Sequence, residues 1–571
     1  MRLLQLPLLP SLLALTNARE LASYLVNVQL NQTTIRGQYN ASLGVETFLG
    51  VPYATSERFR RATLVNYSSN DTVDGSKFGV ACPQLPSSGP LGVDYGVYGI
   101  AEDCTSLNIY RPQGTTGNAS LPVMLWVHGG QLTVGAASHF SGHELVKFSA
   151  SIGMPIIQIG INYRLAVWGF LGGTVASEKG AQNLGLYDQR EALRWVQSWI
   201  GNFGGDPKKV TVFGQSSGAI SLSYHALNVS TDLFRGAIFE SGSTTSVSVV
   251  DAPYYDTVYD GMVELSGCSS ASDSFECMRT ADSEVLYNAS VALAADKETY
   301  GTRAWGVTID GEIIPDAPSK LTDEGKIASI PFIQGDVRDE GTTFVYPNTI
   351  DNTTALWDFL QQNYHNFNVS LFANDTAKAQ LEALYPEDPA LGSPYGTGSE
   401  TFFGAQFKRA ASLYGDIHFQ APRRRYIEAA VAKGIPAWSY IWSQQPPGAK
   451  DWEGVYHTSE IPYVFLDDGP TRQRDFALQG QTAAYWISFA HNLDPTYPEY
   501  AAWPRYGSEK NAINFTASGS SVAKDYDIEE QIGYVRDATC LSVRCSQPDP
   551  CSYLLSIADQ LVPARIYPHQ R

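Results

Sequence analysis

The stretch Thr211-Val-Phe-Gly-Gln-Ser-Ser-Gly-Ala219 decides the fold of this chain. Lys209 to Phe213 is rich in β-branched and aromatic side chains and predicts a short buried strand. Ala219 to Leu227 is predicted to continue as a helix, and Gly214-Gln-Ser-Ser-Gly218 lies between the two. A Gly-x-Ser-x-Gly turn between a strand and a helix is typical of a nucleophile elbow. Its glycines permit a turn too tight for Cβ atoms, and the turn exposes the hydroxyl of Ser216.

Strands and helices alternate on both sides of this turn. Apolar runs predict buried strands at Leu121 to Val127, Pro155 to Asn162, Gly236 to Ser241, Ile330 to Gln334 and Ala437 to Trp442. Two earlier strands are predicted at Thr34 to Gly37 and Glu46 to Val51, and helices at Asn183 to Asn202 and about Gln479 to His491. Strands that are apolar on both faces predict an α/β fold, in which helices cover a mostly parallel sheet. We expect the chemistry at the carboxyl ends of these strands.

The composition fits one large globular domain. The chain has 571 residues, of which 43% are hydrophobic and 12% aromatic. No linker, low-complexity tract or internal repeat divides it, so we expect a single domain over residues 19–571. The formal net charge of −19 argues against nucleic acid or an anionic membrane surface as a partner. The sequence does not specify an oligomeric state.

The first residues predict export. Arg2 precedes an apolar run from Leu3 to Leu15, and the small residues of a cleavage site follow, up to Ala18. This run is too short to span a bilayer and fits a cleaved signal peptide over residues 1–18. No later stretch predicts stable membrane insertion. Passage through a glycosylating secretory route is supported by Asn-x-Ser/Thr acceptors at Asn31, Asn40, Asn66, Asn70, Asn118, Asn228, Asn288, Asn352, Asn368, Asn374 and Asn514.

Seven cysteines suit an oxidising compartment. Cys540, Cys545 and Cys551 form a C-terminal trio in which at most one pair can form, so one thiol is left over. The rival interpretation is a metal site. No histidine stands at zinc-like spacing beside any cysteine, and we therefore expect no metal.

Ser216 needs a base and a carboxylate, because an alcohol is a poor nucleophile near neutral pH. The candidate base is His457, in a turn-rich loop that leads into an apolar segment. The candidate acid is Glu340, just after a predicted strand. Asp336 and Asp339 are rivals that composition does not exclude. The order Ser216, Glu340, His457 is the order that this fold class uses.

Further sequence blocks follow one another along the chain. They are Phe48-Leu-Gly-Val-Pro-Tyr-Ala54, Glu102-Asp-Cys104, His128-Gly-Gly130, Phe203-Gly-Gly-Asp-Pro207, Phe234-Arg-Gly-Ala-Ile238, Asp339-Glu-Gly341 and Gly454-x-x-His457. Together with the elbow, these blocks resemble the type-B carboxylesterase/lipase family, also called cholinesterase-like, of the α/β-hydrolase fold. The likeness runs from about residue 34 to the Trp503-Pro504 region, and the secreted fungal members are the most similar.

The resemblance implies an α/β-hydrolase with long insertions around the mouth of its active site. It also implies a carboxylic ester hydrolase that needs no cofactor. The family's nucleophile falls on Ser216, its acid on Glu340 and its base on His457. The disulfides that it implies are Cys82–Cys104 and Cys268–Cys277.

Such a reaction places negative charge on the attacked carbonyl oxygen, so backbone N–H groups must already point there. The elbow supplies the N–H of Ser217, and we expect the turn after the strand to supply those of Gly130 and Gln131. The alternative is that Gly129 and Gly130 only form the turn. Gln131 stands where the family usually has a third small residue. Gln215 stands where it usually has glutamate, so the pocket lacks one negative charge.

The predicted substrate is a neutral ester. The segment between Cys82 and Cys104 has no tryptophan to face a quaternary ammonium, which disfavours choline esters, and Tyr95 and Tyr98 could line the mouth. We expect a secreted serine carboxylesterase that forms an acyl-enzyme on Ser216. One alternative is a lipase or sterol esterase with a mobile lid, which needs a large apolar surface at the entrance. Another is a non-catalytic binding protein of the same fold, which would be expected to lack the serine or the histidine.

Overall fold

The computed structural model describes residues 24–86, 99–227, 232–296, 304–363, 375–467, 475–525 and 528–540. Its centre is a 13-stranded sheet in the order β1-β2-β3-β7-β9-β8-β10-β11-β12-β13-β14-β15, with β6 paired to β2. The strands are β1 Tyr24–Leu30, β2 Thr33–Asn40, β3 Val45–Pro52, β6 Thr72–Asp74, β7 Ser106–Pro112, β8 Leu121–Val127, β9 Ile157–Ile161, β10 Gly205–Gln215, β11 Gly236–Glu240, β12 Phe332–Val337, β13 Ala437–Trp442, β14 Asn511–Thr516 and β15 Gly519–Lys524. A separate small sheet pairs β4 Ala54–Thr55 with β5 Thr63–Leu64.

The sheet is parallel in its middle and antiparallel at its edges. From β9 to β14 in the sheet order, every neighbouring pair is parallel. The pairs from β1 to β9 and the β14–β15 hairpin are antiparallel. The predicted mostly parallel sheet is confirmed, and it brings the carboxyl ends of β8, β10, β11 and β12 to one edge.

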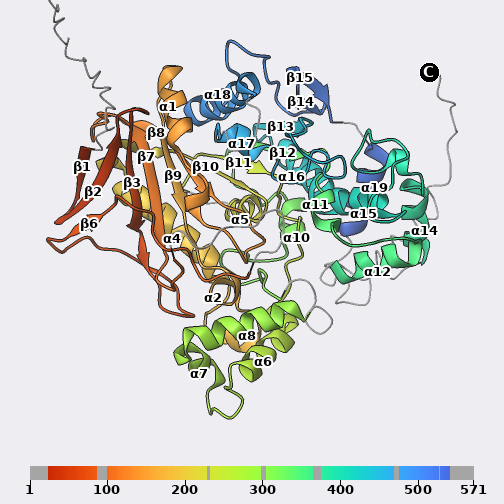
Figure 1. Ribbon diagram of the computed structural model, residues 1–571, viewed down its shortest axis with the longest axis horizontal. Helices are drawn as coiled ribbons and strands as arrows, with labels where there is room; N and C mark the ends of the chain where they lie inside the picture. Colours follow the sequence, from red (N-terminus) through yellow and green to blue (C-terminus); the bar gives the residue numbers. More distant parts are fainter. Residues whose placement is uncertain are drawn as a thin grey trace, which may run out of the picture.

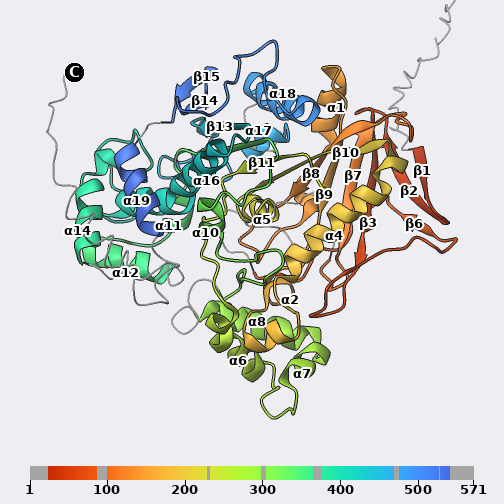
Figure 2. The same ribbon diagram turned by 180° about the vertical axis from the view of Figure 1, so that it is seen from behind.

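Helices cover both faces of the sheet (Figures 1 and 2). Along β8, Val123, Leu125 and Val127 lie in one buried cluster, whereas Met124 and Trp126 lie in another, because successive side chains of a strand point to opposite faces. The first cluster includes residues of α4 Leu184–Trp199, α5 Ser217–His225 and α16 Ala421–Ala432. The second includes residues of α1 His143–Ser151, α17 Ile461–Val464 and α18 Phe476–Asn492.

Helical insertions extend beyond the sheet (Figure 1). One group forms the lobe at the bottom of the view: α6 Asp256–Leu265, α7 Ser274–Thr280 and α8 Ser283–Ala295. Another has its own buried cluster and comprises α11 Thr342–Val345, α12 Thr353–Asn363, α14 Asp375–Leu384, α15 Phe407–Gly415 and α19 Glu529–Cys540. Three further helices are short: α2 Ala166–Phe170, α3 Thr174–Glu178 and α10 Pro318–Asp323.

Element boundaries differ from the predicted ones where polar residues enter strands. β8 and β13 have the predicted bounds. β10 begins at Gly205 instead of Lys209, and β12 continues to Val337, so that Asp336 lies inside a strand. α5 begins directly at Ser217. β1 and the β14–β15 hairpin were not predicted, because their residues mix polar and apolar side chains.

Both implied disulfides are present. Cys82 and Cys104 are joined by an S–S bond of 2.03 Å, and Cys268 and Cys277 by one of 2.06 Å. Several predictions fall outside the described residues: the signal peptide, the mouth residues, three of the acceptor asparagines and the pairing of the C-terminal cysteines, namely residues 1–18, Tyr95, Tyr98, Asn228, Asn368, Asn374, Cys545, Cys551 and the side chain of Cys540.

The described ranges lack both a membrane-spanning helix and a metal-binding cluster. None of the helices there has the length and apolar character to cross a bilayer. Nor does that part of the chain contain a group of three or more histidine, cysteine, aspartate or glutamate side chains arranged to hold a metal ion.

Candidate active site

Ser216 is the turn residue between β10 and α5. Its backbone has φ 57° and ψ −128°, a conformation that L-residues rarely adopt. The turn is held by the Ser216 N–H, which donates to the Glu240 carbonyl at 2.9 Å. A Cβ on Gly218 would lie 2.1 Å from the carbonyl oxygen of Val127, and one on Gly214 would lie 2.7 Å from the same oxygen. Only glycine therefore fits on either side of the serine, as the elbow pattern predicts.

The structure brings Glu340 and His457 together. Glu340 follows β12, and its Oε2 lies 2.5 Å from Nδ1 of His457. Its other oxygen accepts the Val337 N–H at 2.9 Å. A backbone bridge between Asp339 and Tyr456 joins the two loops. Both side chains of the pair are 1% exposed, so their hydrogen bond is shielded from water.

The two rival aspartates have other partners. Asp336 lies within β12 and accepts the Nε–H of Arg423 at 2.7 Å. Asp339 accepts the Ser393 hydroxyl, the Tyr395 N–H and the Val455 N–H, each at 2.9 Å. Asp339 therefore ties the His457 loop to the neighbouring segment.

The hydroxyl of Ser216 makes no hydrogen bond to any described residue, so the serine–histidine bond of the predicted triad is not formed here. The elbow residue that contacts the imidazole is Gln215, which precedes the serine. The side-chain nitrogen of Gln215 lies 3.1 Å from Nε2 of His457 and 3.5 Å from Nδ1. Catalytic hydrogen bonds are often made only once substrate is bound, and the pairing of Ser216 with His457 stays a prediction.

Burial tunes both members of the Glu340–His457 pair. It lowers the pKa of His457 to about 4, against the charges of Glu460 and Asp336. The imidazole is therefore neutral at neutral pH and able to accept a proton. Burial also acts to raise the pKa of Glu340 above its usual range. The Ser241 hydroxyl, the Val337 N–H and the Arg423 charge oppose this effect and favour the carboxylate.

The predicted oxyanion-hole residues lie on two elements. Gly130, Gln131 and Leu132 all have positive φ, of 109°, 58° and 63°. Among the described residues, no acceptor is hydrogen-bonded to the N–H of Gly130, Gln131 or Ser217. A Cβ on Gly129 would lie 3.0 Å from the Cβ of Ser216, so this turn packs directly on the elbow. Amide groups without partners beside a serine are what an oxyanion requires.

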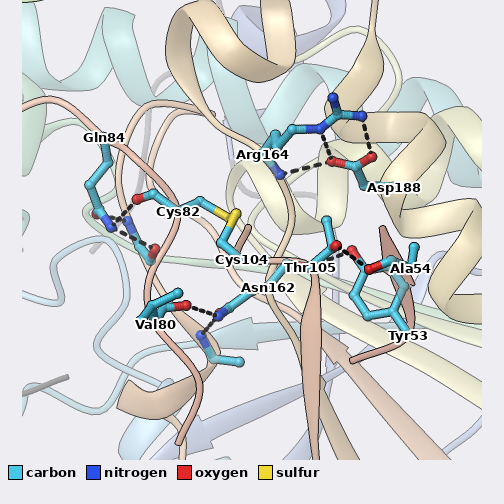
Figure 3. The surroundings of a disulfide bond; sticks show 12 residues. Tyr53, Ala54, Val80, Cys82, Gln84, Cys104, Thr105, Asn162, Arg164 and Asp188 are labelled. Atoms are coloured by element: carbon cyan, nitrogen blue, oxygen red, sulfur yellow. Dashed lines mark hydrogen bonds and ion pairs between the residues drawn. A yellow bond between two sulfur atoms is a disulfide. The ribbon is translucent and has the colours of Figure 1, made fainter. Parts of the chain in front are cut away.

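A polar network holds this turn in place from the disulfide side (Figure 3). Gln84, two residues after Cys82, accepts the Gly135 N–H at 2.7 Å and donates to the Gly135 carbonyl at 3.3 Å. The Tyr163 hydroxyl donates to the His128 carbonyl at 2.7 Å, and the two rings stack with centroids 4.5 Å apart. Burial lowers the pKa of His128 to about 4, which keeps it neutral within the turn.

Two buried glutamates near the site were not predicted as functional residues. Glu240 ends β11 and accepts the indole N–H of Trp486 at 2.7 Å, while Glu460 follows His457 by three residues. Within the described residues, the second oxygen of Glu240 and both oxygens of Glu460 have no hydrogen-bond partner. Burial raises the pKa of Glu460 to about 8 and that of Glu240 well above its usual range. Glu240 could have been noticed in the sequence, because it is a charged residue at the end of the otherwise apolar run Gly236-Ala-Ile-Phe-Glu240.

Comparisons with known proteins agree with this architecture. A family model described as "Carboxylesterase family" matches residues 25–532. The chain is 34% identical to Lipase 4 of Diutina rugosa over 87% of its length and 92% of the relative, and 32% identical to the secreted triacylglycerol lipase of Gibberella zeae over 88% of each. The crystal structure of Aspergillus niger EstA has a TM-score of 0.76 at 25% identity, covering 90% of this chain and 98% of that one. A thermophilic pNB esterase has a TM-score of 0.73 at 26% identity, covering 89% and 99%.

Proposed function

Since this chain belongs to the carboxylesterase family and is a carboxylic ester hydrolase (EC 3.1.1) of α/β-hydrolase fold, we propose that it cleaves esters through an acyl-enzyme on Ser216. The observation that carries the proposal is the buried hydrogen bond between Glu340 and His457 beside a strained serine turn. This arrangement supplies a neutral imidazole next to an alcohol that is otherwise unreactive.

In the proposed reaction, Nε2 of His457 takes the proton of Ser216 while Oγ attacks the ester carbonyl. The N–H groups of Ser217, Gly130 and Gln131 stabilise the negative charge on the carbonyl oxygen. His457 then gives its proton to the leaving alcohol. Water repeats the sequence on the acyl-enzyme and releases the acid. Glu340 stabilises the imidazolium in both halves of the reaction.

A fluorophosphonate, which phosphonylates the nucleophilic serine of serine hydrolases with loss of fluoride, tests the nucleophile. We expect one equivalent to react with the protein, on Ser216 in a peptide map, and none to react with Ser216→Ala. Ser221→Ala is the matched control. Ser221 is a buried serine on α5, the helix that follows Ser216, and its hydroxyl donates to the Ser217 carbonyl. Labelling that persists in Ser216→Ala would refute the proposal. Absence of labelling in the wild type would instead favour a non-catalytic binding protein.

We propose neutral esters as the substrate class, with triacylglycerols or sterol esters as the second candidate. The relatives named lipases favour the second candidate, whereas the thermophilic pNB esterase favours the first. A panel of esters with increasing acyl length, compared by kcat/KM, distinguishes the two. Activity that rises abruptly when a long-chain triglyceride exceeds its solubility would identify a lipase.

We also propose that the protein is extracellular. Several relatives are named secreted lipases. Residues 1–18 would be the removed signal peptide, and residues 19–571 the hydrolase domain. N-terminal sequencing of protein collected from culture medium is expected to begin at Arg19.

A further inference from the structure

Gln215 is the last residue of β10 and the neighbour of Ser216 in the elbow. In the sheet register it stands beside Glu240 of β11, and its side chain is buried. Among the described elbow residues, it is the one whose side chain is hydrogen-bonded to His457. The strand that places the nucleophile therefore also places an amide against the base.

The amide lies over the face of the imidazole. Its nitrogen is 3.1 Å from Nε2 and 3.5 Å from Nδ1. A donor on the in-plane lone pair of Nε2 would be much farther from Nδ1, because the two ring nitrogens flank Cε1 and their lone pairs point apart. A position in the ring plane beside Cε1 would clash with the Cε1 hydrogen. The lone pair of Nε2 thus stays available to the Ser216 hydroxyl.

Two phenyl rings contact the same imidazole. The centroids of Phe344 and Phe419 lie 5.0 Å and 4.9 Å from that of His457, at interplanar angles of 55° and 41°. The two phenyl rings also stack on each other at 5.6 Å. Together with the Glu340 hydrogen bond, these contacts leave the imidazole little room to turn.

The charged groups that act on the imidazole are all acidic. Glu340 bonds to Nδ1, and the charges of Glu460 and Asp336 favour the imidazolium. A further carboxylate on the face of the ring would add to this effect, since a nearby opposite charge favours the charged form. The amide of Gln215 fills that place without charge.

We propose that Gln215 is a positioning residue for His457. Its uncharged amide contacts the face of the imidazole and, together with Phe344 and Phe419, keeps the ring in the orientation that links Glu340 to Ser216. The role rests on the proposed function, because it concerns the base of that reaction. The amide keeps the ring oriented without stabilising the imidazolium in the resting enzyme. Replacing the amide by an apolar group and replacing it by a carboxylate should therefore have different effects.

Two substitutions of similar size separate the effects, each made in the full chain. Gln215→Glu puts a carboxylate over the ring, and we expect the acidic limb of the kcat/KM profile for a soluble neutral ester to move up by about one pH unit or more. Gln215→Met keeps the bulk but loses the amide. For this variant we expect kcat to fall about tenfold, with little change in KM or in the acidic limb, as for a misplaced base.

Gln189→Met is the matched control. Gln189 is also a buried glutamine paired with a histidine ring, since its Oε1 lies 3.0 Å from Nε2 of His225, away from the site. We expect this variant to keep the wild-type pH profile and kcat. An acidic limb that is identical in Gln215→Glu and the wild type, with both proteins folded, would overturn the proposal. A loss of kcat in Gln189→Met as large as that in Gln215→Met would also overturn the proposal.

A measurement that does not depend on catalysis separates this proposal from the proposed function. In the Ser216→Ala background, the imidazole of His457 can be titrated by NMR, with His457→Gln to assign its signals. Adding Gln215→Glu should raise the observed pKa. If that pKa rises but phosphonate fails to label wild-type Ser216, the proposed function is wrong and the contact is real. If the pKa is unmoved while labelling succeeds, only the role of Gln215 is wrong.

Discussion

At the scale of single residues, burial decides the protonation of the side chains around Ser216. His457 is surrounded by aromatic rings and carboxyl groups, and desolvation outweighs the attraction of those carboxyls for an imidazolium. None of this is visible in sequence, because the partners of His457 come from segments that are far apart along the chain. Ser216 and His457 carry local patterns, whereas the contact between Gln215 and the imidazole depends on how the end of β10 meets the loop of His457.

The pKa of His457 predicts activity at unusually low pH. The reaction needs a neutral imidazole, and burial lowers the pKa of His457 to about 4. We therefore expect kcat/KM to fall only as the pH drops through about 4, and not near 6.5, the ordinary value for histidine. The measurement uses a neutral ester whose groups do not titrate, over brief assays at each pH. An acidic limb near 6.5 would contradict the prediction.

Glu460 predicts a loss of stability as the pH rises from about 4.5 to about 8. Its pKa rises from 4.5 to about 8 on folding, so its contribution is complete below 4.5 and is lost as the pH rises through 8. Within that window each pH unit costs about 1.4 kcal/mol. We expect Glu460→Gln to flatten the decline of Tm within this window, between about pH 5 and pH 8. Glu509→Gln, which alters an exposed ion pair with Lys524, is the control and should leave the decline unchanged.

At the scale of elements, sequence reasoning succeeded where one strand is apolar on both faces. β8 and β13 were predicted with their bounds for this reason. It failed at the end of β12, where Asp336 interrupts the apolar run. Asp336 belongs to the strand because Arg423, 87 positions away, donates to it inside the protein. A long-range ion pair of this kind leaves no local pattern.

The same arginine predicts a strong dependence of folding on one aspartate. Arg423 and Arg424 of α16 both contact Asp525, which joins this helix to the segment before α19. All three side chains are almost fully buried. Asp525→Asn removes the anion that the two buried arginines share and leaves Arg423 with Asp336 and Arg424 with Glu529, and we expect a loss of about 3 kcal/mol in the free energy of unfolding. Urea unfolding measures it, and a loss below 1 kcal/mol would contradict the argument.

At the scale of the whole molecule, the fold and the family are confirmed, and the comparisons extend them over nearly the full chain. The mostly parallel sheet followed from alternating strands and helices. The family resemblance implied long insertions, but not which helices form them or that they have a separate core, since α12, α14 and α15 are held by contacts with one another and with α19. The catalytic assignments of Ser216, Glu340 and His457 stay predictions until the nucleophile is labelled.

The sheet also predicts which acceptor asparagines carry glycans. Asn514 lies within β14, between β13 and β15, and its side-chain oxygen is buried. Strand side chains point to the faces of a sheet, so a glycan on this buried amide would displace whatever packs over β14, and we expect Asn514 to be unmodified in folded protein. Asn31, Asn66 and Asn118 are exposed and accessible to modification. Mass spectrometry of glycopeptides tests this difference, and a glycan on Asn514 would contradict it.

The link from Cys82 through Gln84 to Gly135 makes the enzyme sensitive to where it is made. Without the cross-link, the turn that carries Gly130 loses its anchor, so newly made chains in a reducing cytosol should fold with an inactive catalytic centre. Cells would then be protected from their own product until the chain reaches an oxidising compartment. A Cys82→Ala/Cys104→Ala protein that remains folded should show kcat at least tenfold below the wild type; full activity would refute this safeguard.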